Sequence, residues 1–180
     1  MKKFILPSIL IGVILFFWQF VSFAAANLHH GSQQYTAKQD TIIKFMSSLN
    51  LPDGKYMIPI PAPELKPEEK QKIHSQNDGK PWMSVSYYSK MDVDMSKPLI
   101  RGLLSDIVAG FFLMFILNAI GSVSLMKSIF HTVAIGIFGF IFIPYTNHVW
   151  YPAFDIPAYL IDAIVPYSLI GFLNAKFWNK

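Results

Sequence analysis

Residues 4–26 have the sequence FILPSILIGVILFFWQFVSFAAA, which contains no charged side chain. A transmembrane helix needs about 20 apolar residues to cross the hydrocarbon core of a bilayer, so this segment is long enough to cross one. Three further apolar segments follow, at residues 100–120, 128–145 and 158–175. Because lipid cannot satisfy open backbone groups, all four segments are expected to be helical. The sequence therefore predicts an all-α membrane fold with four transmembrane helices.

The first segment also has one feature of a cleaved signal peptide. The residues at 24–26 are all alanine, which fits the small-residue pattern that precedes a cleavage site. The apolar region of a signal peptide is usually about 7–15 residues long, whereas this segment is longer and has aromatic residues at 16–18. We therefore favour an uncleaved anchor, with cleavage as the alternative.

Charged residues divide the chain into three regions. They make up 14% of the sequence, well below the roughly 25% of soluble domains. Residues 27–98 contain nine lysines and eight acidic residues, an ordinary soluble balance, and the long apolar segments lie on either side. We predict an anchor helix at 1–26, an extracytoplasmic domain at 27–98 and a three-helix transmembrane region at 99–180.

The predicted domain contains both helices and strands. A capping box at residues 36–39 precedes an apolar stripe that ends at Leu49, which predicts a first helix. Residues 56–60 and 82–89 favour short strands, and residues 66–74 favour a second helix that begins near Pro67. Asn77, Asp78 and Gly79 predict a turn. The domain is therefore expected to be a small α+β unit.

Lysine placement predicts the orientation of the chain. With the N-terminus inside, the cytoplasmic pieces carry no acid and contain Lys2, Lys3, Lys127, Lys176 and Lys180. The short outside loop at 147–157 contains Asp155 and no lysine or arginine. This asymmetry follows the positive-inside rule. We predict a multi-pass protein of the cell (inner) membrane with both termini cytoplasmic.

Two aspartates in apolar segments are the main candidates for a functional site. Asp106 and Asp162 are costly inside lipid unless they are paired or face water. Pro166 cannot donate the backbone bond that the carbonyl of residue 162 normally accepts, which leaves a free carbonyl beside a carboxyl group. The alternative, which the shallow depth favours, is a solvated position or a bond to Arg101, His148 or Tyr159. Asp106, Asp162 and His148 remain a possible functional polar site.

No metal or cofactor site is expected. Thioether and imidazole groups suit copper, but the spacing of the outside residues matches no metal signature; these residues are His29, His30, His74, His148, Met83, Met91 and Met95. The adjacent histidines at 29 and 30 are expected to be interfacial. Asp92 and Asp94 lack the further ligands of a calcium loop.

Polar and small residues within the segments are expected to serve helix packing. We predict hydrogen bonds to neighbouring helices from His131, Gln19, Asn118 and Asn174. Ser8 with Gly12, and Thr132 with Gly136, have the small-xxx-small spacing that lets helices approach closely.

Several function classes are disfavoured. The chain has no cysteine, which excludes disulfides, thiolate metal sites and a cysteine nucleophile. It has no hydrolase, phosphate-loop or dinucleotide motif, so we predict no enzyme activity and no cofactor. The net charge of +4 lies at the ends of apolar segments rather than in a basic patch, so nucleic acid is not expected as a partner.

Five stretches together resemble a group of small bacterial integral membrane proteins to which no activity is assigned. They are residues 14–22 (ILFFWQFVS), 56–59 (YMIP), 80–85 (KPWMSV), 95–98 (MSKP) and 147–151 (NHVWY). The resemblance implies the same anchor, outside domain and three C-terminal helices. It implies no activity, cofactor or site residue.

Three functions are compatible with these features. The first is a non-enzymatic accessory, assembly or scaffold protein that presents its outside domain to a protein partner or a second copy of itself. The second is a small ion or proton transporter or channel component that uses Asp106 and Asp162. The third is an enzyme acting on lipid or envelope substrates. It is the least favoured, because no nucleophile in the sequence has a base at a defined spacing.

Overall fold

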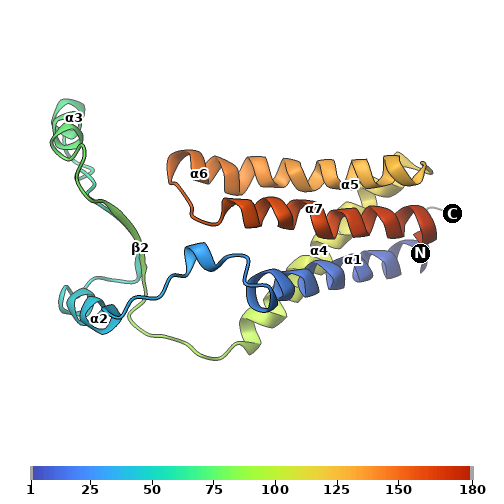
Figure 1. Ribbon diagram of the computed structural model, residues 1–180, viewed down its shortest axis with the longest axis horizontal. Coiled ribbons are helices and arrows are strands. Elements are labelled where there is room, and N and C mark those ends of the chain that lie inside the picture. Colours follow the sequence, from blue (N-terminus) through green and yellow to red (C-terminus); the bar gives the residue numbers. More distant parts are fainter. Residues whose placement is uncertain (1, 179–180) are drawn as a thin grey trace. The chain divides into compact units, whose positions relative to one another are not determined.

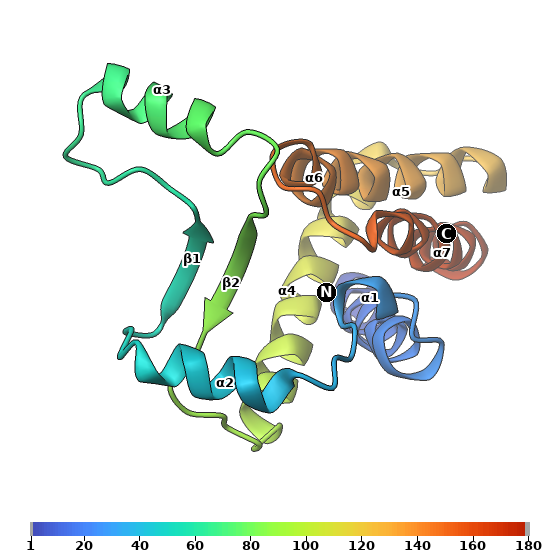
Figure 2. The ribbon, with the colours of Figure 1, turned by 60° about the vertical axis from the view of Figure 1, so that its left-hand side comes forward.

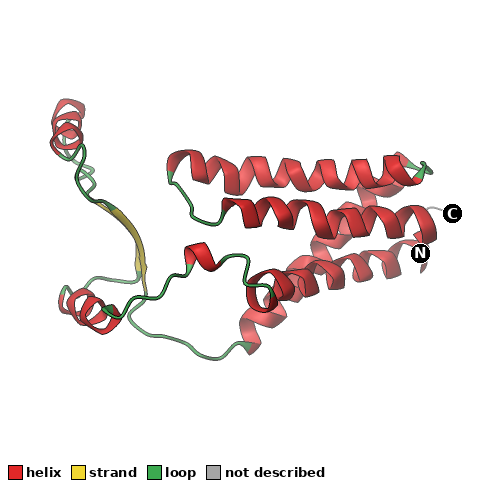
Figure 3. Ribbon diagram, in the orientation of Figure 1, coloured by secondary structure: helices red, strands yellow, loops and turns green. Residues whose placement is uncertain are grey.

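The computed structural model describes residues 2–178, and the chain divides into two compact units. The first unit comprises the chain up to Gln34 and from Asp94 onward, and the second comprises Tyr35–Val93. The first unit contains the long helices. The second contains two short helices and two strands. Figure 3 distinguishes the predominantly helical first unit from the second, which holds the only sheet in the described part of the chain.

Four helices among the described residues are long and apolar enough to cross a membrane, as predicted. The first is α1 (Lys2–Phe20), which continues into a short π-helix, η1 (Val21–Ala25). The second is α4 (Ser96–Ile120). The third is α5 (Leu125–Phe140), which continues through η3 (Ile141–Tyr145) and α6 (Thr146–Trp150), and the fourth is α7 (Ile156–Leu173), which continues into η4 (Asn174–Trp178).

The third helix is longer than its apolar segment. The segment was predicted to end at Tyr145, but the helix continues through three polar residues to Trp150. Tyr151 then adopts an extended conformation, with φ −137° and ψ 92°. The reason is local, because Pro152 follows and a proline disfavours the helical conformation of the residue before it. Backbone chemistry, rather than hydropathy, sets this boundary.

The four helices pack as two antiparallel pairs. α1 packs mainly against α4, α5 packs mainly against α7, and α1 also contacts α7 (Figures 1 and 2). A Cβ atom at Gly12 would lie 2.5 Å from the Cα atom of Ile107, and one at Gly136 would meet the carbonyl oxygen of Ala163. Both predicted small-residue pairs therefore lie at close helix crossings.

Apolar side chains fill the bundle and also cover its outside. Ile11, Leu113, Met114, Leu117 and Ile170 form a buried cluster. Large side chains that point outward include Phe17, Phe112, Phe115, Phe130, Phe138 and Phe142. An exposed apolar surface of this extent is suited to lipid rather than water.

The second unit is built around a two-stranded antiparallel sheet. β1 (Gly54–Ile58) pairs with β2 (Met83–Tyr87), and Tyr56 lies opposite Val85. α2 (Gln39–Ser48) precedes β1, and α3 (Pro67–Gln76) lies in the connection between the strands. Figure 2 shows the two helices at opposite ends of the strand pair. The predicted order of helices and strands is confirmed, with each element shifted by a few residues.

One predicted helix start in this unit is wrong. The capping box at Thr36 is absent, because α2 begins at Gln39 and no side chain caps it. The Thr36 hydroxyl instead accepts a hydrogen bond from the Lys38 backbone N–H at 3.2 Å. Threonine side chains readily form such local turns in competition with helix capping. The predicted turn after α3 is confirmed, and Gly79 there has a φ of +70°.

Candidate functional site

The end of the first long helix turns the chain back across the bundle. Within η1 and just after it, the Ala26 N–H donates to the Val21 carbonyl and the Leu28 N–H to the Ser22 carbonyl. Asn27 has a φ of +47°, a left-handed conformation that asparagine tolerates better than most residues. The reversal carries His29 back over Phe23, and the two rings stack with centroids 3.8 Å apart. A π-helix and a left-handed residue therefore place His29.

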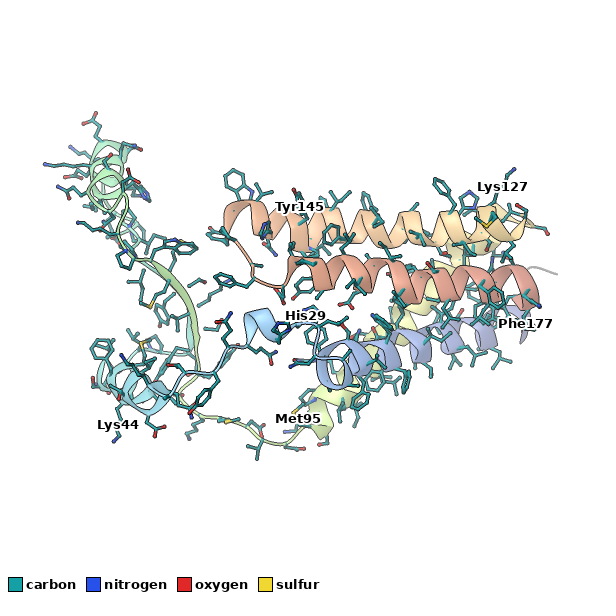
Figure 4. The ribbon with its side chains drawn as sticks, viewed as in Figure 1. His29, Lys44, Met95, Lys127, Tyr145 and Phe177 are labelled. Atoms are coloured by element: carbon teal, nitrogen blue, oxygen red, sulfur yellow. The ribbon has the colours of Figure 1, made fainter. Side chains whose placement is uncertain are left out.

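His29 bridges two carboxyl groups from the last helical hairpin. Its Nδ1 atom lies 2.8 Å from Asp155 Oδ2, and its Nε2 atom lies 3.0 Å from Asp162 Oδ2. The histidine is only 1% exposed. The edge of its ring meets Tyr159, with centroids 4.7 Å apart. Figure 4 shows His29 between the end of α1 and the start of α7. We call His29, Asp155 and Asp162 the His–Asp cluster.

Asp162 receives two more hydrogen bonds from the first helix. Trp18 Nε1 donates to Asp162 Oδ1 at 2.9 Å, and the Ser22 hydroxyl donates to the same oxygen at 2.7 Å. Trp18 and Ser22 are four residues apart, so they lie on one face of the helix. Together with the His29 contact, these bonds engage both oxygens of the Asp162 carboxyl group. The cluster therefore ties α1 and its following loop to α7.

Asp155 has a more enclosed position. It is the residue just before the first turn of α7, and its side chain is 4% exposed. The positive end of the helix dipole favours a negative charge there. Its Oδ2 atom contacts His29, whereas Oδ1 receives no hydrogen bond from any described residue. One carboxyl oxygen of the cluster is therefore open to another donor.

Hydrogen-bond chemistry states the condition under which both His29 contacts are hydrogen bonds. A neutral imidazole has one N–H donor and one acceptor nitrogen, and an ionised carboxyl group only accepts. With a neutral His29 and two ionised aspartates, a ring lone pair would face a carboxylate oxygen. Both contacts are hydrogen bonds only when one additional proton is present, either on the imidazole or on one carboxyl group. In both forms the cluster carries a net charge of −1.

The three residues of the predicted polar site, Asp106, Asp162 and His148, do not contact one another in the structure. Asp162 belongs to the His–Asp cluster, whereas Asp106 lies on α4, where Gln19 Nε2 donates to both its oxygens at 3.0 and 3.1 Å. The two aspartates are thus held by different side chains of α1. His148 Nδ1 accepts the Ala153 N–H at 3.0 Å and contacts neither aspartate. Arg101 also contacts neither of them.

Predicted interhelical hydrogen bonds are confirmed at two of four positions. Gln19 bonds to Asp106, and Asn174 Nδ2 donates to the Ser128 hydroxyl at 3.0 Å. Asn118 is exposed and has no such bond among the described residues. The prediction for His131 is not supported, because its Nδ1 atom is buried and has no described partner. The Phe130 ring lies edge-on to the His131 ring, with centroids 6.1 Å apart.

A cavity opens directly beside the cluster. It has a volume of about 470 Å³ and lies between the third helix and α7. Asp155 and Asp162 line it, together with the aromatic rings of Phe140, Tyr159 and Tyr167. The cluster therefore faces a space large enough for a small molecule.

Comparison with known proteins adds no assignment. The chain matches no protein-family model, no curated protein and no solved structure. The role of the His–Asp cluster is therefore inferred from its own geometry and chemistry.

Sequence reasoning missed most of the cluster. Asp155 was assigned to the short outside loop and His29 was grouped with His30 as interfacial, whereas Trp18 and Ser22 were not put forward as site residues. His30 is exposed and contacts only the Asn27 carbonyl, at 3.1 Å, whereas His29 is fully enclosed. The available signal was one histidine and two acids at the same predicted membrane face, but nothing local distinguishes the two histidines.

Proposed function

We propose that this chain is a non-enzymatic, multi-pass membrane protein that acts as a component of a small proton or ion transporter. In this proposal the His–Asp cluster is the proton-binding site. The observation that carries it is the contact of both His29 ring nitrogens with carboxyl groups at 2.8 and 3.0 Å. In this proposal one shared proton completes both hydrogen bonds, and removing the proton breaks one of them.

The position of the cluster supports an exchangeable proton. Asp162 lies within the candidate membrane span Ile156–Trp178, where an ionisable group is costly and commonly marks a substrate, ion or proton pathway. The cluster also borders a cavity, which we propose as the route by which protons reach Asp155 and Asp162. One carboxyl group would be enough to hold His29 in place. In this proposal the second carboxyl group allows the cluster to hold and release a proton.

A complete pathway requires more than one copy of the chain. Four helices with a filled apolar core leave little room for a continuous polar route within one chain. We therefore propose that a homo-oligomer in the lipid bilayer forms the pathway. Asp106, held by Gln19 on another face of α1, is proposed as a second titratable group on this route.

Reconstituted protein tests the proposed activity. We expect proton or cation flux in proteoliposomes, abolished by Asp162→Asn and His29→Ala and reduced by Asp106→Asn. The amide that Asp162→Asn introduces can donate to a neutral imidazole and still accept from Trp18, so the variant keeps the fold but needs no shared proton. His30→Ala is the matched control and should keep full flux. Flux that is absent from the natural sequence, or unchanged in Asp162→Asn, would end this proposal.

We propose the cell (inner) membrane as the location, with both termini cytoplasmic and the second unit outside. In support, α1 begins and α7 ends at the same end of the helix bundle as Lys127, whereas the His–Asp cluster lies at the other end (Figures 1 and 4). The chain has no cysteine, so single-cysteine variants are clean probes. Lys70→Cys should react with a membrane-impermeant maleimide on intact cells or spheroplasts, and Lys127→Cys should not. The reverse pattern would overturn the orientation.

A second candidate is an accessory, assembly or scaffold protein that presents the second unit to a protein partner. The observation behind it is that Met46 is the only buried hydrophobic side chain among the described residues of Tyr35–Val93. Phe45, Tyr88 and Met91 are 62%, 71% and 89% exposed. A two-stranded sheet is marginal without further cover, so a partner surface would stabilise this unit. Purification in mild detergent followed by mass spectrometry tests this candidate, and recovery of a lone monomer under several conditions counts against it.

A further inference from the structure

We infer that the cavity beside the His–Asp cluster binds a small organic cation, with an ammonium or guanidinium group at Asp155 and Asp162. The role of such a cation as the transported substrate rests on the proposed function, whereas its binding does not. The inference combines the charge of the cavity, an unused acceptor within it and the aromatic character of its walls.

The charge of the lining is negative without local compensation. Asp155 and Asp162 are the only charged side chains that line the cavity among the described residues, and no lysine or arginine joins them. His29 lies behind the two carboxyl groups and is 1% exposed, so it does not present its charge to the cavity. The cluster with its shared proton keeps a net charge of −1. A cation in the cavity would therefore neutralise the site.

An unused acceptor indicates where the cation would be held. The Asp155 side chain is 4% exposed and lines the cavity, and its Oδ1 atom receives no hydrogen bond from the described residues. This oxygen keeps some exposure, because His131 Nδ1 is the only fully buried side-chain N or O atom without a partner in the described part of the chain, so it can accept a hydrogen bond from a ligand in the cavity. An N–H group of a ligand supplies the donor, and its positive charge strengthens the hydrogen bond.

The remaining walls favour an organic cation over a bare metal ion. Phe140, Tyr159 and Tyr167 contribute aromatic rings, whose faces attract cations and whose carbon surfaces accept an apolar body. The volume of about 470 Å³ lies within the range of roughly 300–1,000 Å³ found for small-molecule sites. No group of three or more histidine or acidic side chains in the described part of the chain is arranged to hold a metal ion.

Proton and cation binding are expected to oppose each other. A second additional proton on the cluster would remove its net negative charge, as a bound cation does. Each ligand therefore lowers the affinity of the other, by the reciprocity of linked equilibria. This competition provides the coupling that an exchanger of a proton for an organic cation needs.

Direct binding to the full-length protein in detergent tests the inference without any gradient. Isothermal titration calorimetry is run with benzylammonium as the probe, and with benzyl alcohol, benzoate, sodium and potassium as comparison ligands. We expect saturable binding of benzylammonium, at least about tenfold weaker binding of benzyl alcohol, and no binding of benzoate. Lowering the pH should weaken benzylammonium binding, because protons compete for the same charge.

Three variants locate the site. Asp155→Asn should weaken benzylammonium binding by about tenfold or more, whereas Asp40→Asn, which removes a carboxyl group of the second unit, should leave it unchanged. Gly139→Leu adds an apolar side chain to the cavity lining at a position where a Cβ atom has no neighbour within 4 Å, and it should also abolish binding. Near-ultraviolet circular dichroism confirms that each variant is folded.

The outcomes separate this inference from the proposed function. Equal binding of benzyl alcohol, binding of sodium or potassium alone, or unchanged binding in Asp155→Asn and Gly139→Leu would overturn the inference. Loss of binding with intact Asp162-dependent proton flux would overturn it and leave the proposed function standing. Specific binding without any flux would overturn the proposed function and leave the site assignment standing.

Discussion

Replacing His29 with alanine is expected to destabilise the fold, whereas replacing its neighbour His30 is not. His29→Ala removes two hydrogen bonds to carboxyl groups, at 2.8 and 3.0 Å, and the stacking contact with Phe23. A hydrogen bond to a charged group contributes about 1.5–3 kcal/mol, so the two bonds give about 3–6 kcal/mol. Asp162 is 22% exposed at its side chain and can be partly rehydrated, which places the expected loss at about 3–5 kcal/mol.

Reversible unfolding in mixed detergent micelles measures this difference. His30 is exposed and contacts only a backbone carbonyl, so His30→Ala should change the free energy of unfolding by less than about 0.5 kcal/mol. A double-mutant cycle of His29→Ala with Asp155→Asn should give a coupling energy of about 1.5–3 kcal/mol. Equal effects of the two histidine variants, or a coupling energy near zero, would refute the reasoning that the imidazole bridges buried carboxyl groups.

Three further predictions concern packing, the outside unit and the first helix. Gly12→Ala should destabilise the pairing of α1 and α4 by about 1–3 kcal/mol, because its Cβ would meet helix backbone, whereas Gly139→Ala should be neutral in the same unfolding assay. Hydrogen bonds from Ser89 lower the pKa of the Asp53 carboxyl group below its ordinary value of 3.8. This carboxylate therefore supports the paired strands above that pH, and the support is lost as the pH falls through the lowered pKa. Amide hydrogen exchange of the strands should follow this pH dependence in the natural sequence and not in Asp53→Asn. Finally, the purified protein should retain residues 1–26, because Trp18 and its neighbours hold both intramembrane aspartates; an intact mass that begins at residue 27 would contradict this.

The order of elements in both units was predictable because it depends on local composition. The length of each uninterrupted apolar segment predicts the four long helices. Proline, glycine and asparagine predict where the short elements end. The small-residue pairs were predictable for the same reason, since their spacing along one helix already places them on one face. The predicted capping box was wrong because the Thr36 hydroxyl accepts a hydrogen bond from the Lys38 N–H, a local turn that competes with helix capping.

The candidate site was only partly predictable because its members come from three separated stretches of the chain. Asp162 was identifiable from its position in an apolar segment, where a charge requires an explanation. Its partners were not, since 133 residues separate it from His29 and 144 separate it from Trp18. His148 was put forward as a partner of Asp106 and Asp162, but the Ala153 backbone N–H occupies its Nδ1 atom.

The sequence by itself determined that four apolar helices carry two costly aspartates, because the length of an apolar segment and the charge within it are properties of the chain alone. Tertiary structure decided which groups meet those aspartates. The reversal at Asn27 and the contact of α1 with α7 bring His29 to two carboxyl groups while His30 stays in solvent. Hydrogen bonds act over about 3 Å in a fixed direction, so the path of the backbone, and not residue type, selects the partner.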